Sequence, residues 1–178
     1  MARILMVAAE GLPFIKSGGL ADVIGSLPNE LAKKGHEVRV IMPLYLKIAQ
    51  KFHHEFTLEA QFSVSIAYHE VPVNIWSTMR KDVKFYFVEH KGYFEREEMY
   101  GHIDDGERFA YFQKAVIEMC NQLNYFPEIM HCHDWHTGMI PAMCKEGHSF
   151  DERYRNIRFV YTIHNLAYQG NFGVEMLD

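Results

Sequence analysis

The sequence predicts an α/β protein with a Rossmann-like, doubly wound, mainly parallel sheet and an inserted antiparallel β-hairpin region. An apolar run, a glycine-rich turn, an amphipathic stretch and a second apolar run follow one another over residues 3–43. That order is typical of a βαβ unit, whose two strands lie parallel in one sheet. The same alternation returns over residues 106–164. No repeat or linker interrupts the chain, so we expect one domain of the doubly wound kind.

The first unit begins with RILMVAA (Arg3–Ala9), a short, continuous and apolar run that is typical of a buried strand. A helix follows over Leu20–Gly35, where apolar residues recur at helical spacing and Gly35 is a natural stop. Pro28 lies inside this helix and predicts a kink or an irregular turn. The second strand, HEVRVIMP (His36–Pro43), ends at a proline.

The central region is rich in β-branched and aromatic residues over Phe56–Met79 and Val83–His90. Partial alternation, with the short turn RKD between the two stretches, predicts antiparallel hairpins. The wound pattern then resumes with a helix over Gly106–Leu123, which has one apolar face. We expect a strand, a helix and a strand after it, over Glu128–His133, Thr137–Gly147 and Ile157–His164.

Composition excludes several classes of function. The chain has 18 basic and 23 acidic residues, a net charge of −5 and no basic stripe, which argues against nucleic acid as a partner. Its apolar run near the N-terminus, Ile4–Ala9, is too short to span a membrane and lacks a signal-peptide layout. The three cysteines form no CxxC motif. These features predict a folded cytoplasmic protein with reduced thiols.

Three of the predicted strands end in polar clusters: PFIKSGGLADVIG, HCHDWHTG and IHNLAYQG. Ligands of doubly wound sheets bind at the carboxyl ends of the strands. In the first cluster, Lys16, Gly18 and Gly19 come just before a helix and favour an anion, most naturally a diphosphate. The GxGxxG pattern is absent, and Ile15 stands where a P-loop needs its second glycine. The alternative is an ordinary tight turn beside a solvated lysine.

The second cluster holds three histidines and an aspartate within six residues: His131, His133, Asp134 and His136. One interpretation is a zinc site, although the HxHxDH pattern of metallohydrolases needs its aspartate one residue later. A second is a buried core histidine at His131 beside a polar loop. A third is that His133 and Asp134 bind a hydroxyl of a sugar or acceptor. We consider the metal site the weakest of the three.

The third cluster places His164 and Asn165 directly after a buried strand. Imidazole and amide groups can both donate and accept hydrogen bonds, which suits the recognition of sugar hydroxyls. The alternative is an Asn165 that only turns the chain.

Four motifs in order, KSGGLADV, YFEREEMYG…ERFAYF, HDWHTG and IHNLAYQG, resemble those of bacterial glycogen synthases and plant starch synthases. The resemblance covers nearly the whole chain. It implies the N-terminal half of a two-domain GT-B architecture, in which residues 1–178 form part of the N-terminal catalytic domain and the C-terminal nucleotide-binding domain is absent. It also implies a retaining transfer of glucose from ADP-glucose to the non-reducing end of an α-1,4-glucan, glycogen or starch.

The resemblance also implies the role of each site residue. Lys16 and the backbone of Gly18 and Gly19 would contact the phosphates and glucose of ADP-glucose. His164 would be the catalytic residue beside the transferred glucose. The glucose and acceptor side would be lined by Asp22, Tyr100, Asp134 and Asn165. No metal ion or other cofactor is implied, in agreement with a sequence that has no DxD triplet.

On this interpretation the chain alone is not expected to transfer glucose, because half a cleft buries little of its ligand. The expected partners are ADP-glucose and the glucan, in the cytoplasm or, in a plant, the plastid stroma. Two other functions stay open: a zinc-dependent hydrolase using His131, His133 and His136, and a non-catalytic glucan-binding module. In the second, sugars would stack on Tyr93, Phe94, Tyr100 and Trp135. The sequence leaves the oligomeric state and the choice between ADP and UDP open.

Overall fold

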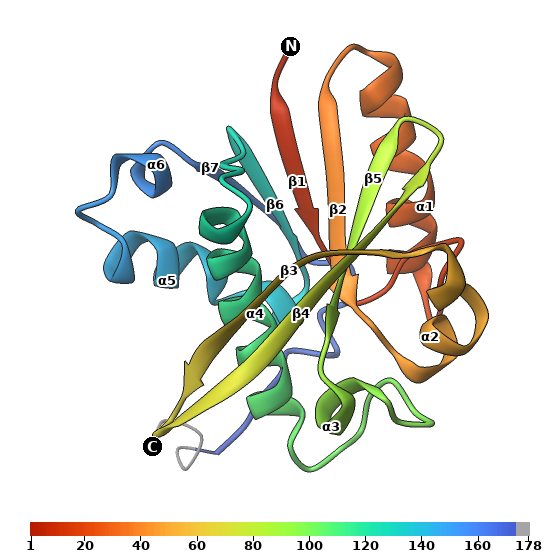
Figure 1. The fold of residues 1–178 in the computed structure, drawn as a ribbon, viewed down its shortest axis with the longest axis vertical. Helices are drawn as coiled ribbons and strands as arrows, with labels where there is room; N and C mark the ends of the chain where they lie inside the picture. The colour runs from red at the N-terminus through yellow and green to blue at the C-terminus, as the bar shows by residue number, and fades with distance from the viewer. Residues whose placement is uncertain (174–178) are drawn as a thin grey trace.

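The computed structural model describes residues 1–173, which form a seven-stranded sheet of order β3-β4-β5-β2-β1-β6-β7 (Figure 1). The strands that run parallel to one another are β1 (Arg3–Val7), β2 (Glu37–Pro43), β5 (Val83–Glu89), β6 (Ile129–His133) and β7 (Arg158–Thr162). The predicted α/β fold with a mainly parallel sheet is confirmed.

The first βαβ unit is confirmed, with α1 (Gly19–Lys33) joining β1 to β2. The helix stops at Gly35, which has a φ of +85° that suits glycine. The N–H groups of Gly35 and His36 donate to carbonyls of the last helical turn, which closes the helix as a Schellman motif. The helix runs on through Pro28, whose side chain is buried.

The antiparallel region is a long hairpin of β3 (Thr57–Ile66) and β4 (His69–Arg80). The predicted turn after β4 is confirmed, since β5 begins at Val83. β5 itself pairs antiparallel with β4 and parallel with β2. The hairpin therefore extends the same sheet rather than forming a separate insertion.

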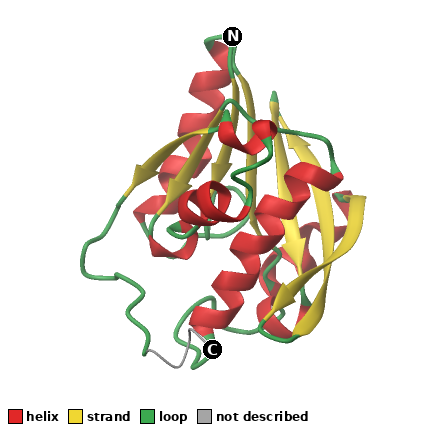
Figure 2. Cartoon of the chain, turned by 90° about the vertical axis from the view of Figure 1, so that its left-hand side faces the viewer, coloured by secondary structure: helices red, strands yellow, loops and turns green. Residues whose placement is uncertain are grey.

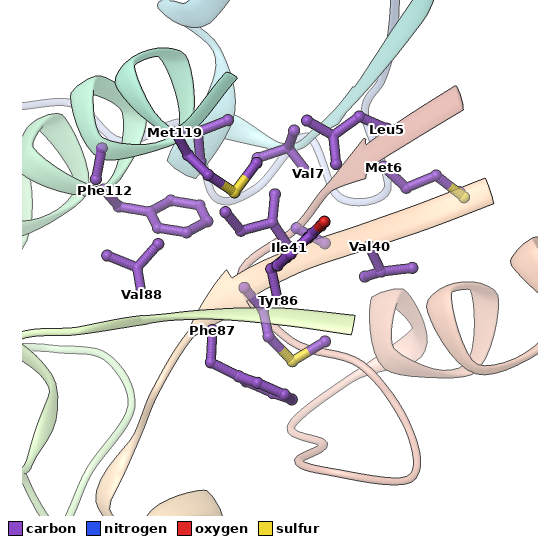
Figure 3. Close-up of a cluster of buried hydrophobic side chains, with 14 of the residues drawn as sticks. Leu5, Met6, Val7, Val40, Ile41, Tyr86, Phe87, Val88, Phe112 and Met119 are labelled. Atoms are coloured by element: carbon purple, nitrogen blue, oxygen red, sulfur yellow. The ribbon is translucent and has the colours of Figure 1, made fainter. Parts of the chain in front are cut away.

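The core lies on both faces of the sheet. Figure 3 shows Val7 and Ile41 directed toward Phe112 and Met119 of α4 (Asp105–Gln122), and all four are fully buried. Val40 points to the opposite face, the one that α1 covers. Because successive side chains of a strand alternate between faces, strands covered on both sides are apolar throughout. This explains why β1 and β2 could be predicted from short apolar runs.

Several short elements were not predicted, because a segment of one or two turns shows no periodic pattern. α5 (Ile140–Gly147) starts three residues later than expected. The missed elements are α2 (Leu46–Phe52), a 3₁₀ turn (His53–Glu55), α3 (Lys91–Phe94), a second 3₁₀ turn (Trp135–Thr137) and α6 (Glu152–Arg155).

Among the described residues, no helix has the length and apolarity needed to cross a bilayer. All three cysteines are buried free thiols.

The register of the parallel strands brings three loops to one edge of the sheet. Val7 at the end of β1 pairs with Cys132, and His133 at the end of β6 pairs with Thr162 at the end of β7. After β7 the chain continues as a loop without helix or strand up to residue 173 (Figure 2). The loops that follow β1, β6 and β7 therefore meet at the carboxyl ends of the strands.

Candidate functional site

A cleft of about 1020 Å³ opens at this edge of the sheet, between the loops after β1, β6 and β7 and the segment before α4. Its volume suits a ligand of the size of a sugar nucleotide. Residues predicted from the sequence that line it are Gly18, Gly19, Tyr100, Asp134, His164 and Asn165. Three separate sequence clusters thus contribute to one site. A smaller hollow of about 430 Å³ is lined by residues of β3, β4, α4 and α5 and by His148, none of which lines the cleft.

The loop after β1 is held rigidly by Phe14. This ring is 6% exposed and packs against Phe52, Phe85 and Phe87, with ring centroids 4.8 to 5.2 Å apart. The backbone also closes on itself, since the N–H of Gly11 donates to the carbonyl of Ile15 at 3.1 Å. These contacts fix the backbone path that leads to Gly18 and Gly19 at the cleft.

Glu10 is a cleft residue that the sequence analysis missed. Its side chain is 3% exposed, and its carboxylate accepts the N–H groups of Ser17 at 2.5 Å and Gly18 at 3.1 Å. These charge-assisted bonds compensate for the burial of a carboxylate. The sequence signal was an acidic residue placed directly after a buried apolar strand.

Because the N–H group of Gly18 already donates to Glu10, a ligand at this turn must bind the N–H groups that follow, from Gly19 onward. No described side chain caps the first turn of α1, and the N-terminal N–H groups of a helix have no partner within the helix. The space beside Gly19 is open, since a Cβ placed there would meet nothing within 4 Å among the described atoms. The start of α1 at Gly19 is therefore accessible from the cleft.

Lys16 and Asp22 lie beside this turn and bind each other at 2.7 Å. Their side chains are 46% and 54% exposed, and exposed ion pairs contribute at most about 1 kcal/mol. Neither residue belongs to the cleft lining formed by residues 1–173. The pair can therefore open at little cost.

Asp134 has a strained backbone, with φ 57° and ψ 178°, a combination that residues other than glycine rarely adopt. Its N–H donates to the carbonyl of Thr162 at 2.9 Å, and its carbonyl accepts the Thr137 hydroxyl at 3.1 Å. Its carboxylate accepts the backbone N–H of His164 at 2.7 Å. These bonds hold the strained conformation and join the loop after β6 to the loop after β7.

His133 does not line the cleft, which corrects the expectation that it binds a sugar hydroxyl directly. It is fully buried, because the strand pleat turns it inward, and its Nδ1 lies 3.0 Å from Nε2 of His164. Burial, followed by the neighbours His131 and His164, lowers the pKa of His133 to about 3. His133 is therefore neutral at physiological pH. It contacts His164, which lines the cleft, and does not line the cleft itself.

His136 lines the cleft and is also neutral. Burial, followed by the charge of Arg108, lowers the pKa of His136 to about 3. Its ring stacks on Trp135 at 4.1 Å and lies 4.9 Å from the ring of Tyr100. Arg108 is fully buried behind the cleft and donates to Asp105 at 3.0 Å.

The zinc-site interpretation is not supported by this geometry. Nε2 of His131 lies 2.7 Å from the Thr162 hydroxyl, and Nδ1 of His133 faces His164. His136 stacks on Trp135 instead of joining them. Within residues 1–173, no three histidine, cysteine or carboxylate groups are arranged to hold a metal ion.

The aromatic residues proposed to stack on sugars separate into two groups. Phe94 is fully buried, and Tyr93 packs on His90 and Tyr111 away from the cleft lining. Tyr100 and Trp135 line the cleft. Burial first, then the neighbours Tyr45 and Glu10, hold the pKa of Tyr100 well above its usual value, so its hydroxyl stays protonated.

The chain is similar in sequence to a known protein family along nearly its whole length. A family model described as "Starch synthase catalytic domain" matches residues 3–178. The chain is 47% identical to a glycogen synthase of Streptococcus agalactiae and 45% identical to one of Clostridium kluyveri, each over 98% of this chain and 37% of the relative. The chain belongs to the starch synthase catalytic-domain family. It thus spans about 37% of the length of these curated relatives.

A solved starch synthase structure has the same fold. It is described as the catalytic domain of Starch Synthase IV from Arabidopsis thaliana bound to ADP and acarbose. The TM-score is 0.87 at 28% identity, over 99% of this chain and 36% of that one. The order of motifs that suggested a starch synthase thus agrees with both the sequence and the structure comparisons.

Replacing Asp134 tests whether its backbone is strained. Asp134→Ala removes the bond to His164 and keeps the unfavourable φ, whereas Asp134→Gly removes the bond and relieves the strain. We expect the glycine variant to be more stable by about 1 kcal/mol in urea unfolding. At Glu30, an exposed position inside α1, the matched pair should show the reverse order. If the Asp134→Ala variant were as stable as Asp134→Gly, the claim that the backbone of Asp134 is strained would be wrong.

The buried histidines predict a loss of stability in mild acid. Their folded-state pKa of about 3 lies below the unfolded value near 6.5, so the unfolded chain binds more protons between these values. Stability should fall with pH, by about 2 kcal/mol for each histidine at pH 5. His136→Phe should reduce the loss of stability between pH 7 and 5 by about 2 kcal/mol in urea unfolding. A flat wild-type profile between pH 7 and 5 would contradict this expectation.

Proposed function

We propose that the chain is the N-terminal part of a retaining glucosyltransferase that moves glucose from ADP-glucose to the non-reducing end of an α-1,4-glucan. The observation that carries the proposal is the convergence of three motif loops on one cleft at the carboxyl edge of the sheet. The relatives named glycogen synthase, and a similar structure that holds ADP and acarbose, support this substrate class.

The diphosphate would bind at the start of α1. The helix dipole and the N–H groups beside Gly19 favour negative charge there. Lys16 would leave Asp22 for the phosphates, which frees the Asp22 carboxylate to accept a sugar hydroxyl. Fixed dipoles and one lysine would then stabilise the charge of the leaving group, without a metal ion or other cofactor.

The transferred glucose would lie between this helix and the loops after β6 and β7. His164, Asn165 and Asp134 supply the imidazole, amide and carboxylate groups suited to sugar hydroxyls. Tyr100 and Trp135 supply aromatic surface on the same cleft. We infer that the acceptor attacks from the face that the diphosphate leaves. Its oxygen would form the new bond to the anomeric carbon while the bond to phosphate breaks, and its proton would pass to the leaving phosphate.

The opposite wall of the cleft would come from a second nucleotide-binding domain, which would hold the base and close the site. β7 and the residue after it offer exposed apolar side chains for further chain to pack on, with Val160, Tyr161 and Ile163 exposed by 44%, 43% and 53%. On this proposal residues 1–178 alone are inactive, and the complete enzyme works in the cytoplasm on ADP-glucose and glycogen or starch.

Lys16→Ala should lower glucosyl transfer with little effect on folding. A hydrogen bond to a charged group contributes about 1.5 to 3 kcal/mol, so kcat/KM should fall about 10- to 100-fold. The assay measures glucose incorporation from ADP-glucose into glycogen by the product of the complete reading frame that contains this chain.

Lys33→Ala is the matched control for this variant. Lys33 also lies on α1 and also forms an exposed ion pair, with Glu30 at 2.6 Å, but it is at the far end of the helix. Its loss should leave transfer unchanged. Equal activity of the Lys16→Ala and wild-type enzymes would contradict the assigned role of Lys16, and no incorporation by the wild-type enzyme would contradict the proposed function.

A further inference from the structure

A hydrogen bond joins the buried His133 to His164, which lines the cleft. Nδ1 of His133 and Nε2 of His164 are 3.0 Å apart, and the two rings are nearly parallel, with 21° between their planes. We propose that His133 is a positioning residue that fixes the tautomer of His164, so that His164 carries its proton on Nδ1 and serves the cleft as a hydrogen-bond donor. The tautomer does not depend on the proposed function. Only the identity of the ligand that accepts a hydrogen bond from Nδ1–H of His164 rests on that function.

The bond requires one nitrogen to donate and the other to accept. Nε2 of His133, the other nitrogen of the buried ring, has no hydrogen-bond partner among the described residues. If His164 were the donor, the neutral His133 would carry its proton on this Nε2. A buried N–H group without an acceptor would result, and such groups are rare because they lose their hydration without replacement.

The opposite arrangement avoids this cost. With its proton on Nδ1, His133 donates to Nε2 of His164 and leaves only a lone pair unpartnered at its own Nε2. His164, whose Nε2 then accepts, must carry its proton on Nδ1 when it is neutral. The tautomer of the cleft histidine therefore follows from the burial of its neighbour.

A protonated His133 is also disfavoured by its surroundings. It would combine a buried charge with the same unpartnered Nε2–H group. The groups that face it are the ring of His131, at 4.0 Å between centroids, and the ring of His164. His131 in turn bonds the Thr162 hydroxyl, while the nearby carboxylate of Asp134 is engaged with the backbone N–H of His164. Burial accordingly lowers the pKa of His133 to about 3.

This arrangement gives His164 a defined chemical role. A ring that accepts from His133 at Nε2 has no free lone pair left to take a proton from a ligand. Its Nδ1–H can only donate, which suits a hydroxyl oxygen of a sugar bound in the cleft that His164 lines. On the proposed function, His164 orients the transferred glucose and is not a general base.

The test measures the tautomer directly, by long-range ¹⁵N–¹H correlation spectra of the histidine rings in the product of the complete reading frame. The wild-type protein should show His164 protonated on Nδ1 and unprotonated on Nε2. His133→Leu, which fills the buried site with an apolar side chain and removes the donor, should give a mixture of both tautomers. Its kcat/KM should fall about tenfold, the value of one hydrogen bond.

Two further variants separate positioning from general packing. His133→Asn places an amide N–H near the position of Nδ1 and should restore both the tautomer and most of the activity. Thr162→Val removes the neighbouring bond to His131 and should leave the His164 spectrum and turnover as in the wild type. A His164 protonated on Nε2 in the wild type overturns the proposal, as does an unchanged tautomer in His133→Leu or an equal shift in Thr162→Val. Because the spectra need no turnover, a wrong proposed function would leave the tautomer result standing.

Discussion

The bond between the Asp134 carboxylate and the backbone N–H of His164 is the interaction on which the site depends. It joins the loops that follow two neighbouring parallel strands, at 2.7 Å, and it requires a backbone conformation at Asp134 that costs roughly 1 to 3 kcal/mol. The surrounding bonds to Thr137 and Thr162 offset that cost. Once His164 is placed in this way, its ring meets His133, and Asn165 follows it into the cleft.

The charges around the start of α1 differ in how easily they rearrange. Glu10 is buried and holds two backbone N–H groups, so it shapes the turn and stays in place. Lys16 and Asp22 form an exposed pair that contributes little to stability and can exchange partners. Asp22 neutralises the charge of Lys16 in this pair. An arriving diphosphate would replace the aspartate as the partner of the lysine, so the donor sugar could gain a cation and a carboxylate in one step.

The sequence predicted the features that depend on local pattern. The apolar runs of β1 and β2 and the apolar face of α4 follow from burial on both sides of the sheet, and glycine at position 35 marks the end of α1. The sequence did not predict the double pairing of β5, the carboxylate of Glu10 at Ser17, or the contact of His133 with His164. These depend on which strands become neighbours and in what register. His133 was expected to touch a ligand because its residue type suits one, but the pleat of β6 directs it inward.

The most direct test of the account is a crystal structure of the product of the complete reading frame with ADP-glucose bound. We predict the diphosphate at the start of α1, with Lys16 moved from Asp22 to the phosphates and Glu10 still bonded to Ser17 and Gly18. We also predict the glucose between that turn and the residues Asp134, His164 and Asn165. A sugar nucleotide bound outside this cleft would contradict the account. So would a complex in which the phosphates displace Glu10 while Lys16 remains on Asp22.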